Sequence, residues 1–230
     1  MSAPATPQGS STRLLVLGCV RIFQPVHGYF LRRELVSWEV DQWAHVHPGS
    51  IYNALKSLTR SGLLEEVGVV ADGPRPQRTT YALTAAGEDE FFALVRSGLV
   101  SIDDPTFFLT AVNMAFALPR DEVVGTIETR IGALEDYLRV LGAQIQQILA
   151  APDTPDTATE VARLIGARTR GELEWARDFL DRVRAGAYAF QGEPPLWTPT
   201  PEQIEVARLA GVGPGVLTAQ YGHVIVKVDE

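Results

Sequence analysis

The sequence predicts a mainly α-helical protein with one small β-hairpin, and three observations lead to this fold class. Apolar residues recur with helical spacing through most of the 230 residues. The spacing changes where two β-rich runs, LLEEVGVVAD and RTTYALT, flank a Gly-Pro-Arg-Pro turn signal at residues 73–76. Beyond residue 104 the segments are long, amphipathic and acidic. We therefore expect one domain of helices and a hairpin, followed by a helical domain.

Before the hairpin, the signals for helix starts and stops predict three helices. Residues 1–11 have no periodicity and are expected to form a disordered tail. A first helix should follow the tail and end before Pro25, and a second is expected over residues 27–38. The third begins at Pro48, because proline lacks the N–H group that goes unpaired in a first turn, and it stops at Gly62.

After the hairpin, all long segments have helical spacing. Thr84 is a good N-cap and predicts a helix over residues 85–99. Residues 107–118 are apolar on nearly every side, so we expect them to be buried, with a second copy of the same segment as one candidate for their cover. Residues 121–150 and 156–187 are amphipathic and are separated by prolines, which predicts an antiparallel helical hairpin.

These elements divide the chain into four expected parts: a disordered tail at residues 1–11, a domain at 12–100, a helical domain at 101–190 and a Pro/Gly-rich extension at 191–230. Within the extension, a short helix is expected near residues 202–210 and a β-like run at 223–228.

Composition and charge exclude several classes of protein. The net charge is −8, but the first 100 residues carry nine basic and nine acidic residues, so the acidic excess lies in the remainder. A neutral domain of this kind can bind DNA when its basic residues share one face. No uncharged apolar run approaches the ~20 residues of a membrane span, and the N-terminus lacks a signal-peptide pattern. We therefore expect a cytoplasmic protein with no membrane partner.

The third predicted helix has two chemically distinct faces. Ile51, Leu55 and Leu58 recur at i, i+4 and i+7 and form an apolar stripe. The opposite face carries Gly49, Asn53, Lys56 and Arg60, flanked by Ser50, Tyr52 and Ser57. Asparagine can read adenine, lysine can reach guanine or phosphate, and hydroxyl groups suit phosphate oxygens. This face is therefore expected to enter the major groove of double-stranded DNA.

The order of three helices, a β-hairpin and a fourth helix is typical of a winged helix-turn-helix domain. In such a domain the hairpin is the wing, and Arg75 lies in its turn while Arg78 opens the returning strand. Arginines at these places commonly reach a phosphate or a minor groove. Taken alone, the pair is better explained by solvated loop residues, but beside the third helix a DNA contact is favoured.

Four motifs resemble the PadR family of bacterial transcriptional regulators: LLVLGCV, HGYFLRREL, HPGSIYNALKSLTRSGLLEE and RTTYALTAAGE, within residues 12–100. The resemblance implies a homodimer held by an α-helical C-terminal dimerisation domain, and repression relieved by a small-molecule effector. It carries the family's DNA contacts over to Ser50, Tyr52, Asn53 and Lys56 on the third helix, and to Arg75 and Arg78 at the wing. The wing departs from the family, which more often has glycine and several basic residues where this chain has Pro-Arg-Pro.

Other candidate sites have weaker support. Trp175 and Phe179 share one helix face and fit either an effector pocket or a dimer core equally well. The single cysteine, Cys19, lies between apolar residues and is expected to be a core residue. His27, His45 and His47 lack metal-ligand spacing, so no metal site is expected, and no motif indicates a cofactor or an enzyme.

The alternative function is a winged-helix adaptor that binds proteins and not DNA. An adaptor would have an uncharged third helix and wing, whereas this chain has Lys56, Arg60, Arg75 and Arg78 there. A sequence-specific DNA-binding regulator, more specifically a repressor on a pseudo-palindromic operator, is therefore the favoured interpretation.

Overall fold

A computed structural model describes residues 7–70, 78–152, 154–155, 157–194, 196, 217–218 and 225–226. The first part of the chain contains α1 (Pro7–Phe23), β1 (Val26–His27), α2 (Gly28–Ser37), α3 (Val40–Trp43), α4 (Pro48–Arg60), β2 (Leu64–Val70), β3 (Arg78–Leu83) and α5 (Ala85–Val100). The predicted helices, hairpin strands and their order are confirmed. We call the assembly of these elements with α6 (Pro105–Met114) and the 3₁₀ helix η1 (Ala115–Ala117) the body.

Three features of this part differ from the sequence-based expectation. Helix α1 begins at Pro7, so residues 7–11 are helical and do not belong to a disordered tail, and Ser11 is buried. Proline in the first turn costs a helix no hydrogen bond, so the helix can begin at Pro7. A search for Ser or Thr caps does not find such a start. Helix α3 has only four residues, too few to show a period, and follows Glu39, whose φ is 55°. Strand β1 has only two residues and forms by pairing with β3.

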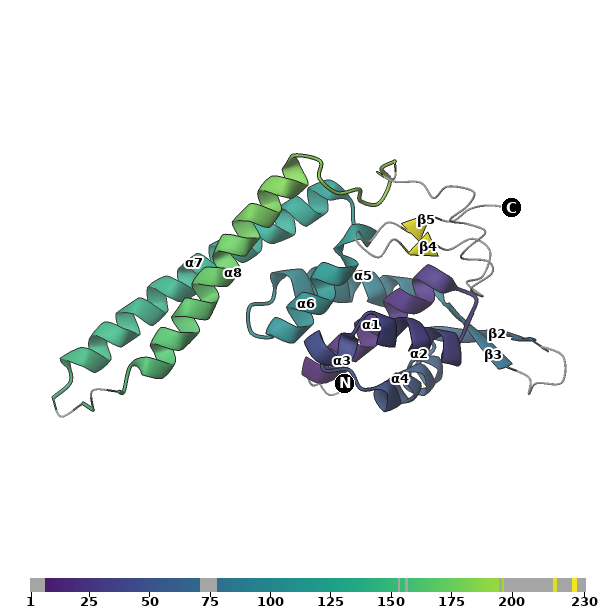
Figure 1. The fold of residues 1–230 in the computed structure, drawn as a ribbon, viewed down its shortest axis with the longest axis horizontal. Helices are drawn as coiled ribbons and strands as arrows, with labels where there is room; N and C mark the ends of the chain where they lie inside the picture. The colour runs from purple at the N-terminus through teal and green to yellow at the C-terminus, as the bar shows by residue number, and fades with distance from the viewer. Residues whose placement is uncertain are drawn as a thin grey trace.

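The sheet has the order β1-β3-β2, and all its strands are antiparallel. Strand β3 is therefore central, and the β2–β3 hairpin extends away from the helices (Figure 1). The helices and the sheet of the body enclose one hydrophobic core. Every residue of α1 from Leu14 to Val20 is buried, so this stretch is covered on all sides. Helix α1 is thus the central helix of the body.

Most of the apolar residues of helix α6 (Pro105–Met114) and the short 3₁₀ helix η1 (Ala115–Ala117) are buried, as their composition predicts, but Leu109 is 46% exposed. Their cover comes from the chain itself: α6 lies against α1 and α5. An added Cβ at Gly98 of α5 would come within 2.6 Å of Ala111 Cβ, which shows how closely these two helices approach. The buried residues of α6 therefore need no second copy of the chain as cover, and Gly98 lets the backbones of α5 and α6 come together.

Helices α7 (Arg120–Ala150) and α8 (Glu160–Arg184) form the predicted antiparallel hairpin. The hairpin projects from the body as a long arm, with its connecting turn at the far end (Figure 1). None of the helices that the structure describes is both long enough and apolar enough to cross a membrane.

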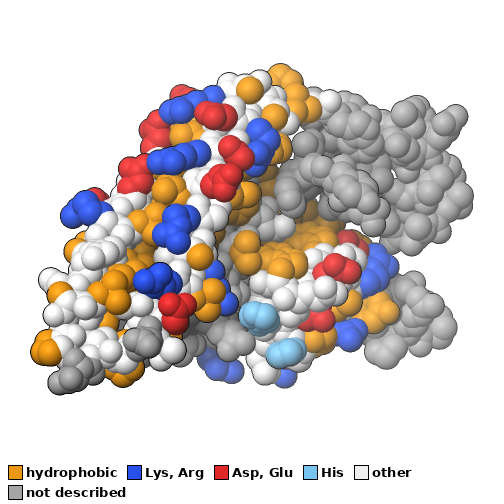
Figure 2. Space-filling view, turned by 60° about the vertical axis from the view of Figure 1, so that its left-hand side comes forward, with side chains coloured by type: hydrophobic (Ala, Val, Ile, Leu, Met, Phe, Trp, Pro, Cys, Tyr) orange, Lys and Arg blue, Asp and Glu red, His pale blue; other side chains and the backbone are white. Residues whose placement is uncertain are grey.

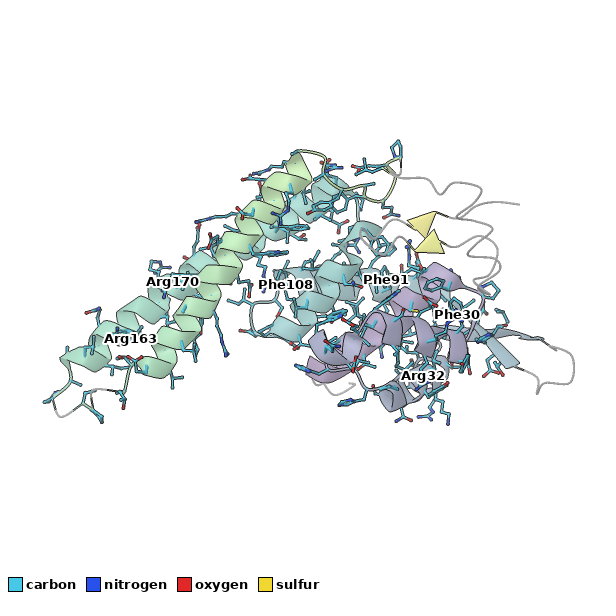
Figure 3. The ribbon with its side chains drawn as sticks, in the orientation of Figure 1. Phe30, Arg32, Phe91, Phe108, Arg163 and Arg170 are labelled. Atoms are coloured by element: carbon cyan, nitrogen blue, oxygen red, sulfur yellow. The ribbon has the colours of Figure 1, made fainter. Side chains whose placement is uncertain are left out.

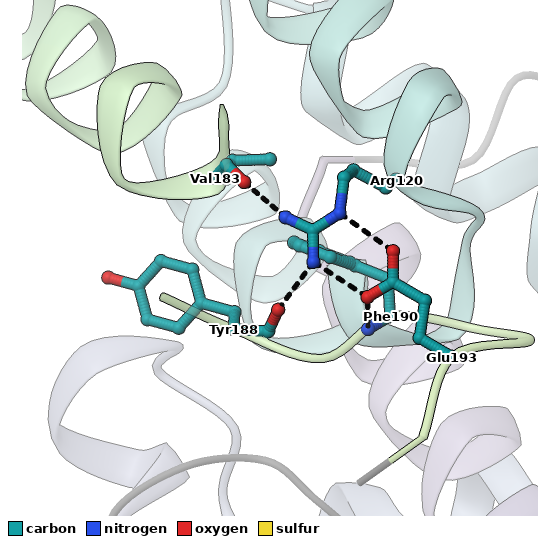
Figure 4. A network of polar contacts seen from close by, with 5 residues as sticks. All are labelled: Arg120, Val183, Tyr188, Phe190 and Glu193. Carbon is teal, nitrogen blue, oxygen red and sulfur yellow. Dashed lines mark hydrogen bonds and ion pairs between the residues drawn. The ribbon is translucent and has the colours of Figure 1, made fainter. Parts of the chain in front are cut away.

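The segment after α8 is fixed to the start of α7 by Arg120 (Figure 4). Its guanidinium donates to Glu193 Oε1 and Oε2, each at 2.7 Å, and to the carbonyl oxygens of Tyr188 and Val183. These hydrogen bonds hold the pKa of the Glu193 carboxyl below its usual value. Phe190 is buried in the same core as the body. The domain boundary expected at residue 190 therefore falls within an anchored segment.

Of the C-terminal extension, the structure describes two short strands, β4 (Leu217–Thr218) and β5 (Ile225–Val226), which pair antiparallel. Strand β5 lies within the β-like run expected at 223–228. The helix expected near residues 202–210 lies outside the described residues.

Candidate nucleic-acid interface

Helix α4 separates its two faces as the sequence predicts. The side chains of Ile51, Leu55 and Leu58 are buried in the core of the body. On the other side Asn53, Lys56 and Arg60 are exposed. The helix lies at the lower edge of the body in Figure 1, and strand β2 of the hairpin packs against it. An exposed polar helix beside a projecting hairpin is the arrangement of a winged helix-turn-helix, whose exposed helix can enter a major groove.

Both ends of α4 are defined by local interactions. Pro48 occupies the first turn, and the Ser50 hydroxyl donates to the carbonyl oxygen of His47 at 2.7 Å. At the other end Gly62 has φ 72° and donates its N–H to Thr59 O, while Leu63 N–H donates to Leu58 O. The two bonds form a Schellman motif, which needs a residue in the left-handed region. The predicted glycine stop is confirmed.

The structure gives two predicted contact residues an additional role inside the protein. Ser50 is only partly exposed and its proton is used in the bond to His47, so its oxygen is free only as an acceptor. Tyr52 is 40% exposed, and its ring edge lies over Gly28 at the start of α2, where an added Cβ would be 3.3 Å from Tyr52 Cε1. Gly28 thereby lets α2 and α4 approach each other and orients the tyrosine.

Several basic side chains of the body form ion pairs, whereas the two on α4 form none within the described part. Arg13, Arg21 and Arg33 form ion pairs with Glu90, Glu88 and Glu34, at 2.7, 2.8 and 3.1 Å. Lys56 and Arg60 have no ion-pair partner among the residues that the structure describes. Their charge is therefore available to phosphate, and no acidic side chain of the described part must be displaced first.

Sequence reasoning missed one candidate of the same kind, Arg32 on α2, which Figure 3 labels. Helix α2 packs against α4, and Arg32 is partly exposed with no carboxylate partner within the described ranges. The neighbouring Arg33 differs because it pairs with Glu34 and lies over the Phe30 ring. The sequence shows only two adjacent arginines, and nothing in it distinguishes the paired one from the other.

The two wing arginines fall at the edge of the part that the structure describes. Arg75 lies outside the described residues, and Arg78 is the first residue of β3, with its side chain outside the description. Their part in DNA binding stays a prediction.

Trp175 and Phe179 are brought together, but they face the protein's own core. Their rings are stacked with centroids 5.0 Å apart and an interplanar angle of 10°. Phe108 of α6 meets Trp175 edge-on at 5.6 Å, and Phe179 is buried. That Trp175 and Phe179 line an effector pocket stays a prediction.

Cys19 has the structural role expected of it, and His27 is a helix cap. Cys19 is fully buried in α1, and this burial, followed by the nearby Glu34 charge, raises the pKa of its thiol well above the ordinary value. His27 caps α2, where its Nδ1 accepts from Phe30 N–H at 3.0 Å. Among the described residues, no group of three or more His, Cys, Asp or Glu side chains could hold a metal ion.

Comparisons with known proteins find similar solved structures and one family. Three of the structures are Bacillus subtilis PadR in complex with operator DNA (20% identity, 74% of this chain and 98% of that chain, TM-score 0.32), smu.1604c from Streptococcus mutans UA159 (19%, 74% and 98%, 0.33), and the PadR-like transcriptional regulator BC1756 from Bacillus cereus (19%, 80% and 99%, 0.30). No match is found among curated proteins. The family match covers residues 16–93, which contain the core of α1, the whole of α4 and the β2–β3 hairpin. Residues 16–93 of this chain match the model of the PadR-like family of transcriptional regulators.

Proposed function

We propose that the protein is a homodimeric repressor that binds a pseudo-palindromic operator through the exposed face of α4. The observation that carries the DNA-binding part of this proposal is the exposed pair Lys56 and Arg60, which no carboxylate of the described part neutralises. Around them Ser50, Tyr52 and Asn53 supply groups that bond to phosphates or base edges. Arg75 and Arg78 of the wing would add contacts to the flanking backbone.

The direct test is fluorescence anisotropy with the labelled DNA upstream of the protein's own gene, over a series of salt concentrations. A regulator binds this DNA with an affinity that falls linearly with salt on a double-logarithmic plot, and it prefers that DNA to a scrambled duplex. An adaptor would bind neither duplex above background. Binding of both duplexes with equal affinity would contradict sequence-specific recognition.

Asn53→Ala is expected to relax the choice of base at one position in each half-site. An asparagine that bonds to both N6 and N7 of adenine contributes about 1–3 kcal/mol of discrimination, and alanine cannot replace these bonds. A binding-site selection on wild type and variant measures the effect. Gln144→Ala, which removes an exposed amide from the α7–α8 hairpin, is the control and should leave the selected sequence unchanged. Identical base preferences for Asn53→Ala and wild type would show that Asn53 does not recognise a base.

The exposed surface of the hairpin supports a second copy of the chain as the partner. Half of the large hydrophobic side chains that are exposed in the described part lie toward its far end: Tyr137, Val140, Leu149, Val161, Leu164 and Ile165. Figure 2 shows hydrophobic side chains along this arm between basic and acidic groups. A hydrophobic stripe on a monomer's projecting arm is a typical interaction site.

Charge on α8 favours an antiparallel arrangement of two such arms. Arg168 and Arg170 lie toward the far end, and neither has a carboxylate partner within the described residues. Glu174, Asp178 and Asp181 lie nearer the body, likewise without an ion pair in the described part, and they outnumber Arg182, the arginine of this half that also forms none there. Antiparallel arms would place the basic half of one protomer beside the acidic half of its partner.

Val161→Asp combined with Leu164→Asp is expected to convert the dimer to monomers, because burying two carboxylates without partners is strongly unfavourable. Analytical ultracentrifugation measures the mass. Val67→Asp is the matched control, since Val67 is also an exposed valine, 47% against 71% for Val161, but lies on β2. A dimer that persists in the double variant, with the same dissociation constant, would contradict the hairpin as the interface.

Relief by a small molecule is the last part of the proposal. A flat aromatic ligand would have to replace one ring of the Trp175–Phe179 stack, which connects the hairpin to Phe108 of the body. Ligand binding there would change how the arm meets the body and hence the operator affinity, by the ~1–3 kcal/mol typical of coupled sites.

A further inference from the structure

The hairpin and the body meet around a buried arginine. Arg130 on α7 is 0% exposed, and its guanidinium contacts three other elements. It donates from Nε to Glu172 Oε1 of α8 at 2.7 Å, and its terminal nitrogens bond to Glu172 and to the carbonyl oxygens of Leu99 and Ser101 at the end of α5. It also lies 3.4 Å from the centroid of the Phe108 ring on α6, a residue that Figure 3 labels beside the hairpin.

This position is the point where the hairpin leaves the body. The buried residues of the body's hydrophobic core reach Ile127 on α7 and begin at Ala176 on α8, and the partly buried Ile131 and Trp175 pack against them. Leu134, Leu141 and Leu173 are buried outside that core, within the hairpin itself. Arg130 and Glu172 therefore lie at the boundary between the two packing units. Beyond them α7 continues to Ala150, which at 1.5 Å per residue is a free arm of about 30 Å.

A buried guanidinium that bonds to several acceptors fixes the orientation of its helix more strictly than apolar packing does. Its planar fork donates hydrogen bonds only in set directions, and any displacement leaves a buried donor unpaired. Burial lowers the pKa of Arg130, and the Glu172 carboxylate opposes this change, so the pair depends on its mutual contact. Apolar residues at the same place would tolerate a range of tilts with little change in energy.

We infer that Arg130, held by Glu172, is the positioning residue that fixes the angle between the hairpin and the body, and thereby the separation of the two operator half-sites that the dimer accepts. The inference rests on the proposed homodimeric DNA binding for its second half. A tilt of about 10° at the base of a ~30 Å arm displaces its end by about 5 Å, whereas successive base pairs are ~3.4 Å apart. A small change of angle is therefore enough to change the preferred spacing by one or two base pairs.

The angle is tested without DNA by measuring a distance within one chain. Spin labels at Asp89→Cys on α5 and Gln147→Cys near the hairpin end attach selectively, because both sites are exposed and native Cys19 is fully buried. Doubly labelled protein is mixed with excess unlabelled protein, so that pulsed electron resonance reports distances within a protomer. Arg130→Lys and Glu172→Gln should each broaden or shift the distance distribution by several ångströms.

Glu135→Gln is the matched control for this measurement. Glu135 pairs with Arg177 at 2.5 Å, so it also joins α7 to α8, but both partners are about half exposed and, among the described residues, neither forms an ion pair with the body. Its replacement should leave the distance unchanged. Unchanged distributions in Arg130→Lys and Glu172→Gln, in variants whose circular dichroism shows a folded chain, would overturn the inference whether or not the protein binds DNA.

The second measurement uses operators with half-site separations varied one base pair at a time. Arg130→Lys and Glu172→Gln should lose at least about fivefold in affinity at the wild-type spacing and bind best at another spacing, or equally over several. Their affinity for an isolated half-site should stay within about twofold, because α4 is untouched. If the variants' affinity depends on half-site separation in the same way as that of wild type, the inference is overturned. Wild-type protein that binds no duplex would instead refute the proposed function, while the distance measurement still decides on the angle.

Discussion

Gly87→Ala is expected to destabilise the folded protein by about 3 kcal/mol or more, the upper range for overpacking. A Cβ at this position of α5 would lie 2.0 Å from the carbonyl oxygen of Leu63 and 3.0 Å from the Leu83 side chain. The Leu63 carbonyl cannot easily move aside, because it accepts the N–H of Thr84 at 3.1 Å, and Leu63 itself closes the Schellman motif of α4. The only relief is a displacement of α5 from the end of α4.

Urea unfolding followed by circular dichroism measures this destabilisation, and Gly125→Ala is the control. Gly125 is an exposed glycine within α7, and a Cβ there meets no atom within 4 Å. Alanine is about 0.8–1 kcal/mol more favourable than glycine inside a helix, so the control should be slightly more stable than wild type. If the free energy of unfolding of Gly87→Ala lies within about 1 kcal/mol of the wild-type value, the contact between α5 and the end of α4 can adjust to an added methyl group, since overpacking typically costs at least that much.

The elements that could be predicted from the sequence are those whose ends are specified locally. Pro48 and Gly62 bound α4, Thr84 caps α5 through a bond from Gly87 N–H at 3.0 Å, and Asp104 caps α6 in the same way. Each of these signals acts within three or four residues, so the sequence alone contains it. Strand β1 exists only because β3 passes beside it, and the cover of α6 comes from helices distant in sequence.

The candidate DNA-binding face could be predicted for a similar reason, since the period of Ile51, Leu55 and Leu58 places the polar residues opposite. The sequence could not predict which basic side chains remain without an ion pair, because ion pairing is decided by tertiary contacts. Arg13 meets a glutamate 77 residues away, and Arg130 meets one 42 residues away. In the sequence Arg130 resembles any charged residue of an amphipathic helix, yet its side chain is completely buried.

Replacing both cations of α4, Lys56→Gln with Arg60→Gln, is expected to lower operator affinity by at least about 100-fold at moderate salt. A hydrogen bond to a charged group contributes about 1.5–3 kcal/mol, so removing two in each half-site exceeds the effect of any single base contact. The slope of log affinity against log salt should become shallower by ~0.9 for each phosphate that the variant no longer neutralises. Anisotropy titrations at several salt concentrations give both quantities.

The control must remove equal charge without touching α4, because a net charge of −8 already repels DNA in general. Arg177→Gln with Arg184→Gln does this on α8, where both arginines are exposed and form surface ion pairs with Glu135 and Glu128, pairs of little energetic consequence. If this control lowers the affinity and the slope as much as the α4 variant, the effect is one of total charge. If only the α4 variant does so, the two cations bind phosphates directly, since counterion release is determined by local contacts and is nearly insensitive to charge on a distant arm.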